Sequence, residues 1–106
     1  MDKDGYPEYK ELKIIAKWDF RKKSIQEFLE YIRERWHYQG CGGFNLSGKK
    51  ILQLRLNTFG WSGNESILSA VKINTVFWLM CWRKSTVGGH YWFRVKLNLF
   101  KEKNGK

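Results

Sequence analysis

Histidine and cysteine are the residue types in this sequence that are best suited to chemistry, and the chain has two of each. Histidine is the side chain whose ordinary pKa lies near neutrality, and His90 could form an acid–base pair with Glu65 for phosphodiester hydrolysis. The sequence offers neither an aspartate cluster for Mg²⁺ nor a nucleophile-elbow motif that would complete such a site. We therefore expect a protein that is not an enzyme and that carries no cofactor.

A zinc site is the other chemistry that these residue types could support. His37, Cys41, Cys81 and His90 would supply four ligands, which is the right number for zinc. Three residues separate the first two and eight separate the last two, and neither spacing matches a usual zinc motif. We expect no metal site.

Two segments alternate apolar and polar residues, which is typical of strands with one buried face. The first is residues 51–59, and the second, residues 90–100, has the clearest alternation in the chain. If the two strands are neighbours, their outward residues form a basic surface with aromatic rings between the cations: Gln53, Arg55, Asn57, His90, Trp92, Arg94 and Lys96. Such cations neutralise phosphates, and such rings stack with bases. The alternative, a solvated sheet face with one large ring lying on it, stays open.

A glycine-rich turn before a helix start is a second candidate site. The segment 61–65 brings together Trp61, the Ser62 hydroxyl, Asn64 and backbone N–H groups at a helix N-terminus, an arrangement that suits an anion such as phosphate. Glu65 argues against a ligand, because its carboxylate can occupy the same donors as part of a capping box with Ser62. A well-capped helix without a ligand is the alternative.

The first half of the chain predicts a strand, a helix and a hairpin. Residues 10–18 alternate as a half-buried strand does, with Ile15 as the exception. Ser24 and Glu27 form a capping box, and an apolar stripe at helical spacing runs from there to residue 36. Residues 44–59 predict a hairpin with a tight turn at 47–48.

The second half predicts one or two helices and a last strand. A helix is expected to begin at Ser62, and Asn74 with Thr75 would interrupt or re-cap it. Residues 76–82 are apolar all round and fit a helix or a central strand; unbranched Leu79 and Met80 favour the helix, with Lys84 on one side of it. The expected order is β-α-β-β-α(α)-β, an α+β fold with an antiparallel sheet of about four strands and helices on one face.

Composition and charge limit the class of protein. Residues 1–100 are expected to form one domain and residues 101–106 a flexible basic tail. An aromatic content of 17% excludes a disordered basic tail as a description of the whole chain. The net charge is +10, and residues 67–106 hold eight bases and one acid, which predicts an anionic partner. No segment is apolar enough to predict an export signal or a membrane span, and we expect the protein in the cytoplasm.

The segment GWSGNESILSAV…FWLMCWRKSTVGGHYWFRV carries a pairing of a GWSGNE turn with a downstream FW…W and a GGHY strand start. In this pattern, over roughly residues 54–95, the chain resembles a group of short, mostly uncharacterised proteins encoded by phages and prophages. The resemblance implies a phage-type accessory protein made inside a bacterium, and it supplies no catalytic residues. If the two motifs meet in space, Trp61, Asn64, Glu65 and His90 would line one shared site.

Three functions follow as hypotheses. The first is a phage-encoded, non-enzymatic inhibitor of a bacterial defence based on nucleic acid or nucleotides, as anti-CRISPR proteins are. It would bind the defence protein or its ligand through the basic, aromatic surface of Arg55, Arg94 and Lys96.

The second hypothesis is a sponge that sequesters a signalling nucleotide in a concave pocket lined by tryptophan and histidine, and it predicts a homodimer. The third is a general single-stranded nucleic-acid-binding protein, whose affinity would fall steeply with salt. The 24–36 helix exposes Glu27, Glu30 and Glu34 beside two arginines, which makes specific major-groove binding a poor fit.

Overall fold

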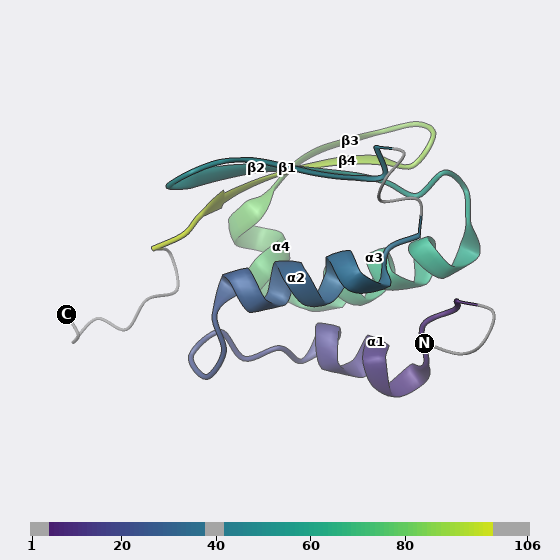
Figure 1. Ribbon diagram of the computed structural model, residues 1–106, viewed down its shortest axis with the longest axis horizontal. Coiled ribbons are helices and arrows are strands. Elements are labelled where there is room, and N and C mark those ends of the chain that lie inside the picture. The colour runs from purple at the N-terminus through teal and green to yellow at the C-terminus, as the bar shows by residue number, and fades with distance from the viewer. Residues whose placement is uncertain (1–4, 38–41, 99–106) are drawn as a thin grey trace.

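The computed structural model describes residues 5–37 and 42–98, and its helices all lie on one face of a single sheet (Figure 1). The expected α+β class, with a four-stranded antiparallel sheet, is confirmed. The elements in chain order are α1 (Tyr9–Ala16), α2 (Ile25–Arg35), β1 (Phe44–Gly48), β2 (Ile51–Asn57), α3 (Ser62–Ile73), α4 (Thr75–Cys81), β3 (Trp82–Thr86) and β4 (His90–Lys96). The expected basic tail at 101–106, and the end of the last predicted strand at 99–100, lie outside the described residues.

The sheet has the strand order β1-β2-β4-β3, and all three pairings are antiparallel. β1 and β2 form the expected hairpin, but the turn lies at Lys49-Lys50, two residues later than predicted, after Gly48 in a left-handed conformation (φ 105°). A long connection through α3, α4 and β3 then returns the chain so that β4 pairs with β2. The expected neighbourhood of these two strands is therefore confirmed.

The strand predicted at residues 10–18 is wrong: this segment is helix α1. Ile15, the exception to the alternation, is fully buried, while Ile14, two positions after Leu12, is 42% exposed. Leu12, Ile15 and Ala16 share the buried side at spacings of three and four residues, which is a helical face. So short a segment fits the two-residue period of a strand and the 3.6-residue period of a helix nearly equally. Packing against α3 and α2 selects the helix.

The fourth strand of the sheet is β3, which the sequence did not predict. All five of its residues are exposed, so it shows none of the alternation that marks a half-buried strand. It forms an edge of the sheet through its pairing with β4, with an irregularity between Trp82 and Lys84. Lys84 therefore lies on a strand, and the expectation that it would lie on one side of the helix is wrong.

The helix starts are a mixture of confirmed and wrong predictions. Ser24 caps α2 as expected: its hydroxyl accepts from the Glu27 backbone N–H, and the Glu27 carboxylate accepts from the Ser24 N–H. Asn74 re-caps the chain as expected, and its side chain accepts from Phe77 N at the start of α4. The second capping box is wrong, because Trp61 is the N-cap of α3 and Ser62 is already its first, exposed residue.

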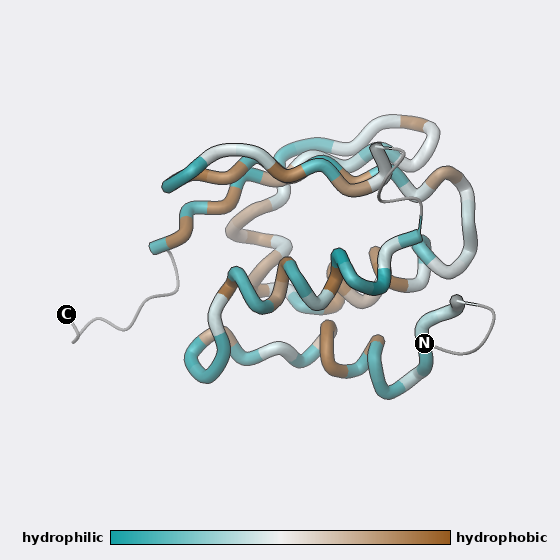
Figure 2. The backbone as a smooth tube through the Cα atoms, in the orientation of Figure 1, coloured by the Kyte–Doolittle hydropathy of each residue, from teal (hydrophilic) through white to brown (hydrophobic). Residues whose placement is uncertain are grey.

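The core lies between the inner face of the sheet and the helices. Figure 2 shows hydrophobic and hydrophilic residues alternating along the strands, as the 51–57 pattern predicts. Phe77 of α4 contacts the rings of Phe28 in α2 and Phe93 in β4, with centroids 4.9 and 5.5 Å apart. All three are at most 1% exposed, so aromatic packing joins two helices to the sheet. Within the described residues, no helix is long and apolar enough to cross a membrane.

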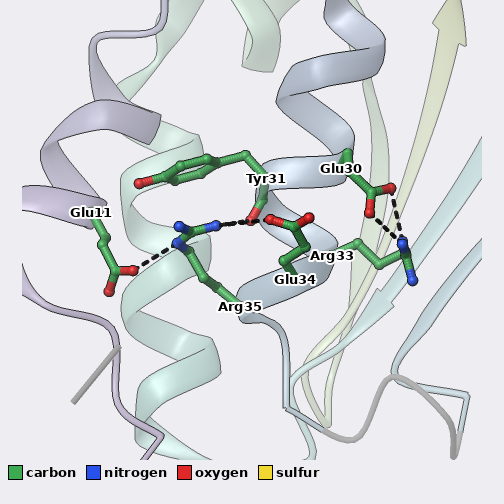
Figure 3. A network of polar contacts seen from close by, with 6 residues as sticks. All are labelled: Glu11, Glu30, Tyr31, Arg33, Glu34 and Arg35. Atoms are coloured by element: carbon green, nitrogen blue, oxygen red, sulfur yellow. Dashed lines mark hydrogen bonds and ion pairs between the residues drawn. The ribbon is translucent and has the colours of Figure 1, made fainter.

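A partly buried ion pair joins α1 to α2 (Figure 3). The Arg35 Nε donates to Glu11 Oε2 at 2.9 Å, and the guanidinium lies 3.5 Å from the centre of the Tyr31 ring. Burial raises the pKa of Glu11, but hydrogen bonds from the Glu8 backbone and from Arg35 outweigh it and lower this pKa to about 2. The ionised carboxylate therefore stabilises the folded state.

We expect Glu11→Gln to lower the free energy of unfolding at neutral pH by about 1–3 kcal/mol, because it removes the buried carboxylate that accepts from Arg35 Nε and leaves the guanidinium only the exposed Glu34 carboxylate. A carboxyl with a depressed pKa contributes stability above its unfolded pKa, 4.5, and loses it as the pH falls towards about 2. Urea unfolding between pH 7 and pH 2 measures both effects. A variant whose stability falls with pH as steeply as that of the native protein would contradict this role for Glu11.

Candidate functional site

The open face of the sheet, opposite the helices, carries the predicted basic and aromatic residues. The β2–β4 register places Arg55 opposite Trp92, Gln53 opposite Arg94 and Asn57 opposite His90. Because the helices cover the other face (Figure 1), these outward side chains face solvent. Lys96 lies opposite Ile51 at the far end of the same pair of strands.

Trp92 lies at the centre of this face and has cations on both neighbouring strands. The Arg55 guanidinium, from β2, lies 5.3 Å from the centre of the ring. The Lys84 ammonium, from β3, lies 4.7 Å from it. Both distances are within the range of cation–π attraction. Lys84 is the residue of this cluster that the sequence missed, because β3 carries no strand pattern and only its pairing with β4 brings it here.

His90 completes the cluster. Its ring lies 6.0 Å from the Trp92 ring, with 28° between the planes. Its Nδ1 lies 3.3 Å from the Arg55 Nη2. A guanidinium can only donate, so a hydrogen bond at this contact has Nδ1 as its acceptor. We name Arg55, Lys84, His90 and Trp92 the Trp92 cluster.

The surroundings of the Trp92 cluster favour anions. None of the four strands contains an aspartate or glutamate, and Glu65 is the single acid in residues 42–98. Arg94 and Lys96 extend the positive charge along β4. A ligand lying along this face would meet one aromatic plane and cations on both sides of it, without carboxylates on the strands beneath it.

Trp61 belongs to a different cluster and has a structural role. Its ring stacks between Tyr6 and His37, with centroids 4.7 and 4.4 Å apart. A Cβ on Gly63 would come within 2.2 Å of the Trp61 ring, so this position needs glycine. The stack joins the N-terminal segment and the end of α2 to the start of α3.

Asn64 is likewise part of the fold. It is fully buried, and its side-chain oxygen accepts from His37 N at 2.8 Å. Its amide nitrogen donates to His37 O at 3.0 Å and to Thr58 O at 3.4 Å. This side chain satisfies the backbone where the chain leaves α2, and it is not available to a ligand.

The GGHY motif contacts Thr58, two residues before the GWSGNE turn, and the two motifs do not form a shared site. Thr58 N donates to Gly89 O at 3.0 Å, and a Cβ on Gly89 would lie 2.2 Å from the Thr58 hydroxyl. Trp61 and Asn64 lie with His37, whereas His90 lies with Arg55 on the open face. Ser62 and Glu65 are exposed on the first turn of α3. The structure therefore divides the predicted residues between the Trp92 cluster and the start of α3.

Within the described part of the chain, the cysteine and histidine residues do not form a metal site or a reactive thiol. Cys81 is fully buried, and burial raises the pKa of its thiol to about 12, so the thiol is protonated. Cys41 lies outside the described residues. Across 5–37 and 42–98, no three histidine, cysteine or acidic side chains gather as metal ligands.

Comparisons of the chain with protein-family models, with curated proteins and with solved structures found no match.

We expect Asn64→Ala to lower the free energy of unfolding by about 1–3 kcal/mol, because it removes the hydrogen bonds of the buried Asn64 side chain to the N–H and C=O of His37. Chemical denaturation measures this loss. Ser62→Ala, two positions earlier and exposed, is the matched control and should change stability by less than about 0.5 kcal/mol. Equal losses in the two variants would show that Asn64 is not the structural residue and would restore Ser62 as a cap.

Proposed function

We propose that the protein binds single-stranded nucleic acid on the open face of its sheet. The observation that carries this proposal is Trp92, half-buried on the open face, with the cations of Arg55 and Lys84 lying 5.3 and 4.7 Å from the centre of its ring. A base stacked on the indole would gain about 1–3 kcal/mol. Its flanking phosphates would meet Arg55, Lys84 and, further along β4, Arg94.

A single strand fits this face better than a duplex does. Stacking on Trp92 requires a base whose own face is free, and paired bases in a helix do not offer one. The α2 surface, which would have to enter a major groove, exposes Glu27, Glu30 and Glu34. The Glu30 carboxylate already pairs with Arg33, so one of the cations of that surface is neutralised.

The resemblance to phage and prophage proteins extends this proposal to a biological role. A small protein that covers single-stranded nucleic acid, without cutting it, would inhibit a bacterial defence that reads or carries such a strand. This role is the first of the three hypotheses drawn from the sequence, a non-enzymatic, anti-CRISPR-like inhibitor that acts in the host cytoplasm. Two observations support this role. The basic face has the charge that suits a nucleic acid, and the resemblance implies an origin in a phage.

We expect Trp92→Ala to weaken binding of a labelled single-stranded oligonucleotide by about 5- to 150-fold, because it removes one base-stacking plane. The dependence of affinity on salt should remain, since no charge is removed. Fluorescence anisotropy over a salt series measures both. Trp61→Phe is the matched aromatic control, because its ring lies in the stack with Tyr6 and His37, and it should bind as the native protein does. Native affinity in Trp92→Ala would refute the proposal.

We expect the triple variant Arg55→Glu, Arg94→Glu and Lys96→Glu to lose binding altogether, and with it any protection of phage in a host that carries the targeted defence. The charge-matched control, Lys10→Glu with Lys13→Glu and Lys17→Glu, places the same change at α1, on the far side of the helices from the sheet (Figure 1). Circular dichroism confirms that both variants fold. Loss of binding in the control as well would show that overall charge, and not this face, is responsible.

A further inference from the structure

A second basic site lies at one end of the molecule. The sequence pattern did not predict it. The α1–α2 loop, the β1–β2 turn and the end of β4 approach one another there (Figure 1), around a cavity of about 930 Å³. Six cationic side chains line it: Arg21, Lys22, Lys23, Lys49, Lys50 and Lys96. They come from three separate parts of the sequence, so only the fold collects them.

Among the described residues, the acidic side chains next to this cavity are already engaged. No acidic side chain is among the described residues that line it. Asp19 lies next to the lining and pairs with Arg21, with its Oδ1 3.2 Å from the Arg21 Nε. Glu27 caps α2 by accepting from the Ser24 backbone N–H at 2.9 Å. The described lining therefore carries an excess of positive charge, which favours an anionic ligand.

The floor of the cavity is apolar. Phe20 and Ile25 are 8% and 2% exposed, and Ile51 and Leu97 complete the apolar lining. A volume of this size is within the usual range for small-molecule sites. An apolar floor under a cationic rim suits a ligand with a flat, apolar part and a phosphate. The apolar part would pack against the floor, and the phosphate would pair with the cations of the rim.

We propose that this end cavity binds a nucleoside phosphate, with its base against the Phe20 floor and its phosphate on the rim around Lys49 and Lys50. The ligand could be the terminal nucleotide of a strand that lies on the open face, or a free nucleotide. The first source rests on the function proposed above: Lys96 lines the cavity and lies four residues after Trp92 on the same strand, about 13 Å away. The second source does not depend on it.

The test compares three forms of one short labelled oligonucleotide, phosphorylated at its 5′ end, at its 3′ end or at neither, together with ADP. We expect a terminal phosphate to raise the affinity of the oligonucleotide above that of the unphosphorylated form, and we expect ADP to bind as well. The double variant Lys49→Gln with Lys50→Gln should remove this phosphate advantage and weaken the binding of ADP, in each case by at least about tenfold. These lysines lie in an exposed turn, so the substitutions should leave the fold intact. Lys10→Gln with Lys13→Gln, on α1, is the charge-matched control and should keep the full advantage.

The outcomes separate the two sources and the two proposals. An advantage for one phosphorylated end, lost in the turn variant, assigns the cavity to the end of a strand. Binding of ADP alone, lost in the same variant, assigns it to a free nucleotide. If the unphosphorylated strand fails to bind while ADP binds through Lys49 and Lys50, the open-face function is wrong and the cavity stands. No phosphate advantage in any probe, or one that survives the turn substitutions, overturns the inference.

Discussion

The pairing of β2 with β4 is the constraint on which the rest of the structure depends. These strands are far apart in sequence, yet their register decides both faces of the sheet at once. It directs Leu54 and Phe93, which lie opposite each other, into the core, and it directs Arg55 and Trp92 to the solvent. Since side chains alternate along a strand, a shift of one residue would exchange the two sets. Core formation and the binding face therefore come from a single choice of register.

Two buried asparagines fix the helix layer beneath this sheet. Asn64 near the start of α3 binds the backbone of His37, and Asn74 at its end donates to Ile15 O and caps Phe77 N. Both side chains are buried, and each has its own amide groups paired with backbone groups of distant segments. They join α3 to the ends of α2 and α1, so the longest helix is held at both ends by polar contacts rather than by apolar packing alone.

The GWSGNE and GGHY motifs have a physical explanation in these contacts. Gly63 makes room for the Trp61 ring, Asn64 closes the end of α2, and Gly89 accommodates Thr58, two residues before the first motif. These residues shape the fold, and of the motif residues named as one site, His90 is the one on the open face. A sequence pattern that looks like a site can thus be the signature of a scaffold, while the proposed binding surface lies on neighbouring strand positions.

The sequence by itself determined the elements whose signals are local. The capping box at Ser24, the Asn74 cap and the alternation along 51–57 and 90–96 each depend on residues within a few positions of one another, and each was confirmed. The same alternation predicted which side chains of β2 and β4 face outward, and so most of the candidate binding face.

Only the tertiary structure decided the features that depend on distant partners. Residues 9–16 fit two periods, and burial of Ile15 against other helices chose the helix. β3 has no buried face of its own, so its pairing with β4 alone makes it a strand and brings Lys84 to Trp92. The six cations of the end cavity come from three segments that no local period relates. Such sites arise from long-range packing, because a linear pattern records the chain's own neighbours and not the surfaces that folding brings together.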